Sequence, residues 1–436
     1  MKRNYIYYLL FFCIGLFATS CVNEEDDLFS KSAAERLNNA IKQSKEVLLA
    51  APNGWVMEYY PTEASGGFTM LIKFHENGSA TVAAQNEYFP EVTSATSEFA
   101  VIGDQGPVLT FNTYNEVMHL FSNPKDPAGG SDLNGLGLLG DYEFVFINVK
   151  EELITLNGKK RGTRIEMRPL SESTDWNVYL NSLYELDKFI FDSKVPYQYI
   201  NTENGRSRLY YGSSHVFLLT ADTDDFNEGD GISVPFIVTS NGIKMYSVNS
   251  VYGNMFQLFE LSADKSTLVA QESNTTITGP DMLKFFSNHD NWENGWDIDS
   301  ENIGGTFKQY YDVIVKNCKE TLFYEEDFEG FIMKYDHFKG FGSKTLSFST
   351  SEDYLGMYGI DAEFTEGSEN LVTFTDNGLV DKNGDIYRRE IEGFDEFIKE
   401  LCKSSFVITA DSPLRPSVLK LTSKENPANW IKVILN

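Results

Sequence analysis

The sequence predicts a mainly β protein with a minor helical content, in which antiparallel hairpins and meanders form two or three β-rich parts. Apolar residues recur with a period of two, as at Met70, Ile72 and Phe74, which is the spacing of a strand with one buried face. Asn-Gly dipeptides, which favour tight hairpin turns, follow such strand-like runs, and amphipathic helical segments separate them. Asn-Gly pairs that follow strand-like runs stand at 77–78, 157–158, 241–242, 377–378 and 383–384.

The first twenty residues have the pattern of a secretory signal. Lys2 and Arg3 precede an almost continuous apolar run from Tyr5 to Ala18. That run has about 14 residues, whereas a helix needs about 20 to cross a bilayer. We therefore interpret residues 1–20 as a signal peptide rather than a permanent anchor.

Cys21 directly follows the small residues Ala18-Thr19-Ser20, and this arrangement resembles a bacterial lipobox. In a lipobox the thiol is diacylated and the peptide before it is removed. Ala18 stands where Leu is commonest, and an ordinary secretory cleavage is the alternative interpretation. Several acyl chains on Cys21 would give a stable membrane anchor, since each buried methylene contributes about 0.8 kcal/mol.

Residues 21–29 form an acidic tether that contains the run Glu24-Glu25-Asp26-Asp27. Like charges keep such a segment extended and solvated. The run also resembles the signal by which Bacteroidetes send lipoproteins to the outer face of the outer membrane. We therefore expect an outer-membrane protein that is lipid-anchored and faces the cell exterior.

The remaining chain divides at boundaries placed near residues 170 and 280. Residues 30–170 are predicted to hold an N-terminal helix, opened by the capping-box pair Ser32 and Glu35, and an antiparallel β domain. Residues 171–280 form a middle β-rich part with a leading helix, and residues 281–436 a C-terminal α+β part. The helices after the first are marked by Trp176, Leu180 and Leu183, by Phe307, Tyr311 and Ile314, and by Phe394, Phe397 and Leu401.

The charge balance excludes one class of partner. The chain has 64 acidic and 36 basic residues and a net charge of −28. Nucleic acids and anionic lipid surfaces attract clusters of Lys and Arg. We therefore expect no nucleic-acid partner.

The sequence carries no recognisable catalytic, metal or cofactor signature. The five histidines are scattered singly, and no nucleophile elbow or phosphate-binding loop is present. One string, made of Asp381, Asn383, Asp385 and Glu392, matches four positions of a calcium loop, but Ile386 replaces the glycine at its sharp turn. We favour a hairpin turn at Asn383-Gly384, and we interpret the acidic stretch 222–230 as a solvated loop. No metal and no cofactor are expected.

Trp292 and Trp296 are the weak candidates for ligand binding. They bracket a turn-rich segment, and indole faces beside Asn and Glu side chains suit a glycan platform, although β proteins more often bury Trp in the core. Cys318 and Cys402 are the cysteines that remain besides Cys21 after the signal is removed. An exported chain allows a disulfide between them, but two buried thiols are equally consistent with their positions in helical segments.

A series of short motifs runs through the first part of the chain. They are Glu35-Arg36-Leu37, Asn53-Gly54-Trp55, Tyr59-Tyr60-Pro61, Gly66-Gly67, Lys73-Phe74, Gly106-Pro107-Val108-Leu109, Phe111-Asn112-Thr113-Tyr114-Asn115, Gly140-Asp141-Tyr142-Glu143-Phe144, Gly158-Lys159-Lys160-Arg161-Gly162-Thr163 and Val234-Pro235-Phe236. These motifs resemble those of a family of Bacteroidetes lipoproteins known as domain of unknown function 4302. The resemblance implies an accessory of a nutrient-uptake system of the SusC/SusD type. It implies no activity, and the lipidated Cys21 is the one functional residue that it carries over.

These features predict a non-enzymatic binding or assembly accessory of a glycan or peptide uptake system. The alternatives are a hydrolase of glycans or peptides that uses dispersed carboxylates, and a purely structural scaffold. Two carboxyl groups about 5 to 9.5 Å apart in a cleft favour a glycosidase. An exposed aromatic strip favours glycan binding.

The lipid anchor can be tested directly. Changing Cys21→Ala removes the sulfur that carries the acyl chains, so we expect the protein to move from the membrane fraction to the soluble fraction. The measurement is fractionation of cells after detergent-free washing, with Cys402→Ala as the matched control. A Cys21→Ala protein that stays with the membranes would contradict the lipoprotein interpretation.

Overall fold

The computed structural model describes residues 31–125, 137–191, 194–212, 215–223, 231–321, 327–337, 342–351, 355–367, 370–410 and 412–436. The predicted signal, Cys21 and the acidic run Glu24–Asp27 lie outside these residues, as does most of the acidic stretch 222–230. The protein is mainly β, with antiparallel strands and a few helices, as the sequence predicts.

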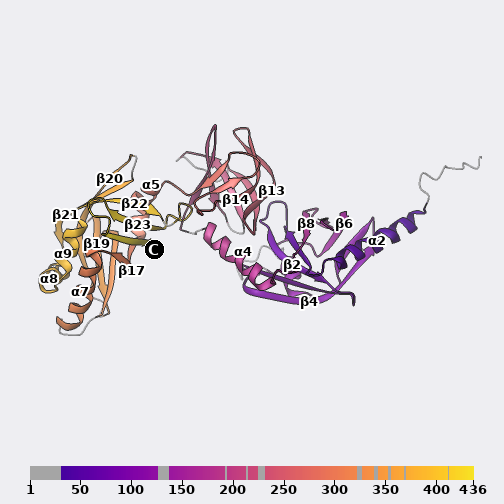
Figure 1. The fold of residues 1–436 in the computed structure, drawn as a ribbon, viewed down its shortest axis with the longest axis horizontal. Helices are drawn as coiled ribbons and strands as arrows, with labels where there is room; N and C mark the ends of the chain where they lie inside the picture. Colours follow the sequence, from indigo (N-terminus) through magenta and orange to yellow (C-terminus); the bar gives the residue numbers. More distant parts are fainter. Residues whose placement is uncertain are drawn as a thin grey trace, which may run out of the picture.

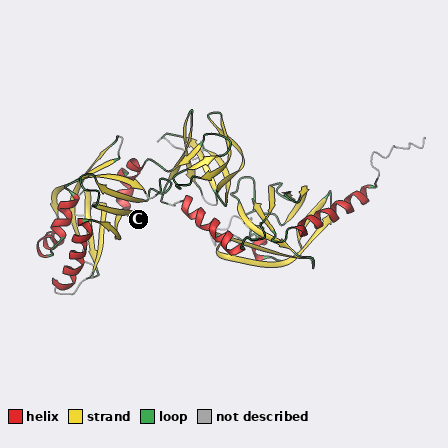
Figure 2. Cartoon of the chain, in the orientation of Figure 1, coloured by secondary structure: helices red, strands yellow, loops and turns green. Residues whose placement is uncertain are grey.

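The described residues form three closed barrels that follow one another along the chain and along the length of the molecule (Figure 1). Each barrel has eight strands in meander order, and its first strand pairs with its last. The helices lie outside the barrels (Figure 2). Barrel 1 ends with β8 at Pro169 and barrel 2 begins with β9 at Tyr197, while barrel 2 ends with β16 at Thr278 and barrel 3 begins with β17 at Trp296.

Barrel 1 has a core of alternating inward side chains. In β1 these are Trp55, Met57 and Tyr59, each at most 1% exposed. Helix α2 (Ala33–Ala50) packs against β4 and β5. Near the C-terminal end of this helix, the carbonyl of Leu48 accepts a hydrogen bond of 2.9 Å from the Trp55 Nε1. The strands are β1 Trp55–Tyr59, β2 Phe68–Phe74, β3 Ser79–Asn86, β4 Phe89–Gly103, β5 Pro107–Phe111, β6 Glu143–Lys150, β7 Leu153–Gly158 and β8 Arg164–Pro169, with the short helix α3 (Glu116–His119) between β5 and β6.

Barrel 2 follows helix α4 (Trp176–Ile190), whose N-cap is Asp175. Its core is filled by residues such as Phe236, Phe256 and Phe259. The strands are β9 Tyr197–Thr202, β10 Gly205–Tyr211, β11 Val216–Ala221, β12 Ile232–Thr239, β13 Gly242–Val251, β14 Asn254–Leu261, β15 Leu268–Ala270 and β16 Thr276–Thr278.

Barrel 3 has the largest apolar cluster and carries more helices than the others. The strands are β17 Trp296–Gly304, β18 Phe328–Asp336, β19 Ser343–Thr350, β20 Leu355–Thr365, β21 Leu371–Val380, β22 Ser405–Ala410, β23 Val418–Ser423 and β24 Trp430–Leu435. Its helices are α5 Met282–Ser287, α6 His289–Asn294, α7 Thr306–Thr321, α8 Lys382–Glu390 and α9 Phe394–Leu401.

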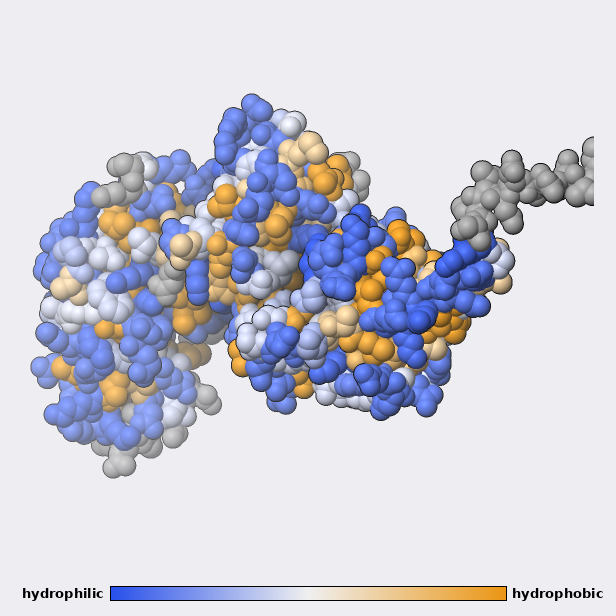
Figure 3. Space-filling model, turned by 45° about the vertical axis from the view of Figure 1, so that its right-hand side comes forward, coloured by the Kyte–Doolittle hydropathy of each residue, from blue (hydrophilic) through white to orange (hydrophobic). Residues whose placement is uncertain are grey.

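Polar residues dominate the surface, which is expected for a chain with this many charges (Figure 3). The large apolar side chains that are exposed include Ile147 on barrel 1 and Ile232 and Met255 on barrel 2. None of the described helices is both long and apolar enough to cross a membrane.

The hairpin expected at Asn77-Gly78 is confirmed between β2 and β3, but its turn is not of type I′. Within this turn, Gly78 is the one described residue with a positive φ, of +82°. The His75 amide donates a hydrogen bond of 2.8 Å to the Ser79 carbonyl. These features are those of a three-residue loop that ends on a left-handed glycine.

The hairpin turn favoured at Asn383-Gly384 is wrong, because these residues lie in the first turn of α8. Asp381 is the N-cap, and its Oδ1 accepts hydrogen bonds from the Gly384 amide at 2.7 Å and from the Met357 amide at 2.9 Å. An N-cap carboxylate satisfies amides that a helix start leaves free. That capping, together with a bond to neighbouring β20, favours a helix over a turn.

Trp292 and Trp296 do not form an exposed platform, so that prediction is wrong. Both side chains are 0% exposed and belong to the core of barrel 3. The Trp292 Nε1 donates to the Phe286 carbonyl at 2.6 Å, which fixes the indole inside. Large aromatic rings contribute most to stability when they are buried, and this gain in stability favours the buried position of both tryptophans.

Cys318 and Cys402 do not form a disulfide. Cys318 lies buried in α7, and Cys402 is the C-cap of α9. Burial raises the pKa of the Cys402 thiol to about 11, so it is an unreactive thiol at neutral pH.

A leucine side chain of barrel 3 packs into the core of barrel 2 and is called here the inserted leucine. Leu414, in the loop between β22 and β23 of barrel 3, is 0% exposed and belongs to the apolar core of barrel 2. Beside it, the Ser412 hydroxyl donates to the Lys265 carbonyl at 3.2 Å. Gly279 allows this approach, since a Cβ there would lie 1.7 Å from the Pro413 oxygen.

The inserted leucine gives a stability prediction. Leu414→Ala should lower the free energy of unfolding by about 2–5 kcal/mol, because it leaves a cavity at the joint. The measurement is urea denaturation, with Leu355→Ala, at a position 60% exposed, as the control that should change little. Equal stability of the two variants would show that the insertion contributes nothing.

Candidate functional site

An exposed group of aromatic rings lies on barrel 1 and is called here the aromatic surface. It consists of Tyr114, His119 and Tyr142, of which Tyr114 is 69% and Tyr142 is 42% exposed. The His119 and Tyr142 rings stack with centroids 5.0 Å apart and planes at 26°. The Tyr114 ring lies 5.4 Å from His119 at 38°.

Asn115 holds the aromatic surface in place. It is 1% exposed and caps α3, since its Oδ1 accepts from the Met118 amide at 3.1 Å. Its Nδ2 donates to the carbonyl of Ala95 in β4 at 3.0 Å. Tyr114 precedes this anchored residue and His119 ends the short helix, so both rings project from a fixed backbone.

A hollow of about 450 Å³ lies beside these rings. Partial burial lowers the pKa of His119 below its ordinary value, so the imidazole is neutral at pH 7. Ring faces next to amide and hydroxyl groups are suited to the apolar face and hydroxyls of a sugar. The polar lining residues are Asn112, Thr113, Ser122 and Asn123.

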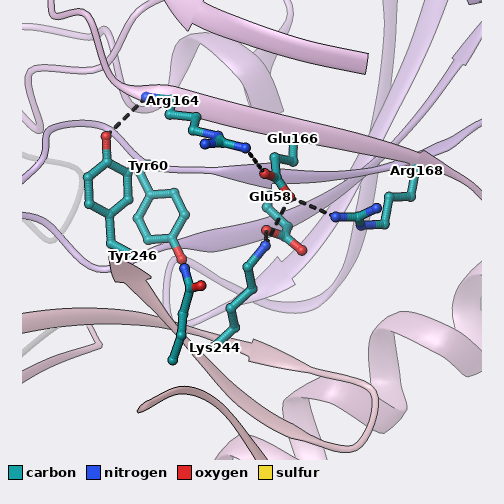
Figure 4. A pocket seen from close by; sticks show the side chains of 8 residues that line it. Glu58, Tyr60, Arg164, Glu166, Arg168, Lys244 and Tyr246 are labelled. Atoms are coloured by element: carbon teal, nitrogen blue, oxygen red, sulfur yellow. Dashed lines mark hydrogen bonds and ion pairs between the residues drawn. The ribbon is translucent and has the colours of Figure 1, made fainter. Parts of the chain in front are cut away.

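A second hollow, of about 260 Å³, lies between barrels 1 and 2 and is called here the junction pocket (Figure 4). Outward side chains of β1 and β8 face those of β13 and β14 across it. Its lining residues are Glu58, Tyr60, Arg164, Glu166, Arg168, Lys244, Tyr246 and Gln257.

Glu58 and Glu166 are direct cross-strand partners in the β1–β8 pair. Like charges in such positions repel, and Lys244 of barrel 2 neutralises both. Its Nζ lies 2.6 Å from Glu58 Oε2 and 3.0 Å from Glu166 Oε2. Arg164 and Arg168 also bind Glu166, at 2.6 and 2.8 Å.

These contacts determine whether Glu166 can act as the proton-donating acid of a glycosidase. Burial alone would raise the pKa of Glu166, but Lys244 and the two arginines hold it below its ordinary value. A glycosidase needs one carboxyl group that stays protonated to donate to the leaving group. Glu166 is ionised and cannot be that group.

The calcium-like string does not form a site. Asp381 caps α8, Asp385 pairs with Arg389 at 3.1 Å, and Asn383 donates to the Leu355 carbonyl at 2.9 Å. In the part of the chain that the structure describes, no three His, Cys, Asp or Glu side chains gather as a metal site would need. Cys21, the predicted lipidation site, lies outside the described residues.

Sequence reasoning missed both hollows. Tyr114 and Tyr142 stand inside motifs that carry the family resemblance. The available signal for the aromatic surface was Tyr114, which lies between Asn112 and Asn115. For the junction pocket the signal was the alternation of Arg164, Glu166 and Arg168, which places three charges on one face of a strand.

Comparison with known proteins identifies one family. The model of the family described as "Domain of unknown function (DUF4302)" matches residues 25–263, which include barrel 1 and the first six strands of barrel 2. No curated protein matches the chain.

Two solved structures with low similarity are bacterial DNA polymerase III β chains. The one from Streptococcus pneumoniae TIGR4 is 10% identical, with 92% of this chain and 97% of that chain covered and a TM-score of 0.15. The one from Borrelia burgdorferi, solved with a natural product, is 10% identical, with 92% and 96% covered and a TM-score of 0.11. At these scores no argument follows from either.

The Lys244 contacts predict a pH-dependent loss of stability. Lys244→Met should cost about 2–4 kcal/mol at pH 7, since two facing carboxylates lose their shared cation. The lowered pKa of Glu166 means that its stabilisation is present above the unfolded pKa and is lost as pH falls through the folded value. The difference from the unchanged protein should therefore shrink at pH 4.

Chemical denaturation at pH 7 and pH 4 measures both values. Lys42→Met is the matched control, because Lys42 is 76% exposed and its ion pair with Glu46 is a surface contact of 3.8 Å. A loss at Lys244 that is the same at the two pH values would contradict the neutralising role.

Proposed function

The chain belongs to the family described as a domain of unknown function (DUF4302), and from that premise we propose that it is a surface-tethered lipoprotein of the outer membrane that binds glycans. It acts without catalysis, as an accessory of a nutrient-uptake system of the SusC/SusD type. The observation that carries the binding role is the aromatic surface of Tyr114, His119 and Tyr142.

The proposed location at the cell surface rests on the sequence before barrel 1. The apolar run, the small residues before Cys21 and the acidic run after it support export, lipidation and exposure to the exterior. The acidic tether would hold the three barrels away from the lipid, because its like charges keep it extended.

The aromatic surface favours a glycan over a charged peptide as the ligand. Its two tyrosine rings are exposed and His119 is neutral, so stacking on an apolar ring face contributes more than ion pairing. The amides of Asn112 and Asn123 lie at the same hollow and can bond sugar hydroxyls. Glu166 in the junction pocket is ionised, so it cannot serve as the general acid of a hydrolase there.

The aromatic surface can be tested by affinity gel electrophoresis in gels that contain neutral polysaccharides. Tyr142→Ala and Tyr114→Ala should each weaken retardation about fivefold, because each removes a stacking ring. Tyr252→Ala on barrel 2, at a position 51% exposed, is the matched control.

Retardation of the unchanged protein by at least one polysaccharide, weakened in both variants and kept in the control, supports the proposal. A protein that is not retarded by any polysaccharide, or variants that are retarded as well as the control, would refute it. Far-ultraviolet circular dichroism of each variant checks that the barrels are intact.

A further inference from the structure

The junction pocket contains a hydroxyl group without a hydrogen-bond partner among the described residues. Tyr60 is 4% exposed, and its Oη makes no hydrogen bond in the described structure. A buried hydroxyl in this condition costs about 1–3 kcal/mol. Figure 4 shows this hydroxyl turned toward the side chains that barrel 2 contributes.

The Tyr60 ring cannot turn away to find a partner. It packs edge-on against Tyr246 with centroids 4.8 Å apart and planes at 64°. On another side the backbone of Gly67 is so near that a Cβ there would lie 2.7 Å from the ring. The hydroxyl is therefore held in one place beside the pocket.

Cations outnumber carboxylates in the lining of the junction pocket. Arg164, Arg168 and Lys244 contribute three positive charges, and Glu58 and Glu166 contribute two negative ones. The pocket thus has an excess of one positive charge in a chain whose net charge is −28. The Arg164 and Arg168 side chains are 61% and 51% exposed, so much of each remains open to solvent.

We propose that the junction pocket binds the carboxylate of a small monoanionic solute of the size of a single uronic acid. One excess positive charge matches a monoanion, and the planar guanidinium fork matches a carboxylate. The Tyr60 hydroxyl donates to the bound anion, and the partly exposed Tyr246 ring offers apolar surface to the rest of the solute.

Two further observations agree with this assignment. Burial and the charge of Glu58 raise the pKa of Tyr60, so its hydroxyl keeps its proton and can donate. The pocket volume of about 260 Å³ leaves room for one sugar ring. The site is separate from the aromatic surface and does not rest on glycan binding there.

The test uses the mature chain and titrates it with sodium glucuronate by calorimetry, with glucose as the neutral control and sodium chloride at matched ionic strength. Saturable binding of glucuronate, without binding of glucose, is expected. Tyr60→Phe should weaken that binding about tenfold, because one hydrogen bond to a charged group is lost. Arg168→Gln should weaken it at least as much.

The thermal midpoint of the ligand-free variant gives a second, independent readout. Because Tyr60→Phe removes a hydroxyl that has no partner, the midpoint should stay the same or rise. Tyr252→Phe and Arg389→Gln, at exposed positions on barrel 2 and α8, are the matched controls and should bind glucuronate normally.

Four results would overturn the proposal. They are absence of saturable glucuronate binding, equal binding of glucose, unchanged binding by both Tyr60→Phe and Arg168→Gln, and a midpoint several degrees lower in Tyr60→Phe. Retardation by polysaccharides at Tyr114 and Tyr142 is measured separately, so failure of this pocket leaves the proposed function standing.

Discussion

Pairing of the first strand of each unit with its eighth strand closes every sheet of this protein. In barrel 1 the closing pair joins Trp55 to Pro169, which are far apart in the sequence. Closure removes the exposed strand edges on which an antiparallel sheet aggregates. An eight-stranded barrel is also just wide enough for side chains to fill. The interiors are packed with aromatic and aliphatic residues, so ligand sites must lie on outer surfaces, at rims or between barrels.

The strand pattern of the fold is local, and it could therefore be predicted. The alternation at Met70, Ile72 and Phe74 and the following Asn-Gly pair indicate a hairpin without further information. Closure of the barrel could not be predicted, because no local sequence pattern indicates that β1 pairs with β8. Asn383-Gly384 fails for another reason. A capping carboxylate two residues earlier changes which local structure the same dipeptide adopts.

The candidate sites were harder to predict than the fold because their residues converge from different elements. Tyr114 and Tyr142 approach each other only because His119, held through Asn115, lies between them. Trp292 and Trp296 have the stronger compositional signal for sugar binding, yet a helix and a strand place both of them in a core. Burial is a property of the closed barrel and not of the residue type.

Closure of barrel 1 and its attachment to barrel 2 are coupled through one lysine. The outer face of the closing β1–β8 pair places Glu58 opposite Glu166, an arrangement that weakens the pair in isolation. Lys244 comes from the neighbouring barrel and contacts both carboxylates, so the closing pair gains this shared cation only when barrel 2 is in place. The same pocket is lined by Tyr60 and by the two arginines that bind Glu166. The lysine that pairs with both carboxylates of the closing strands therefore also lines a hollow with an excess of one positive charge between barrels 1 and 2.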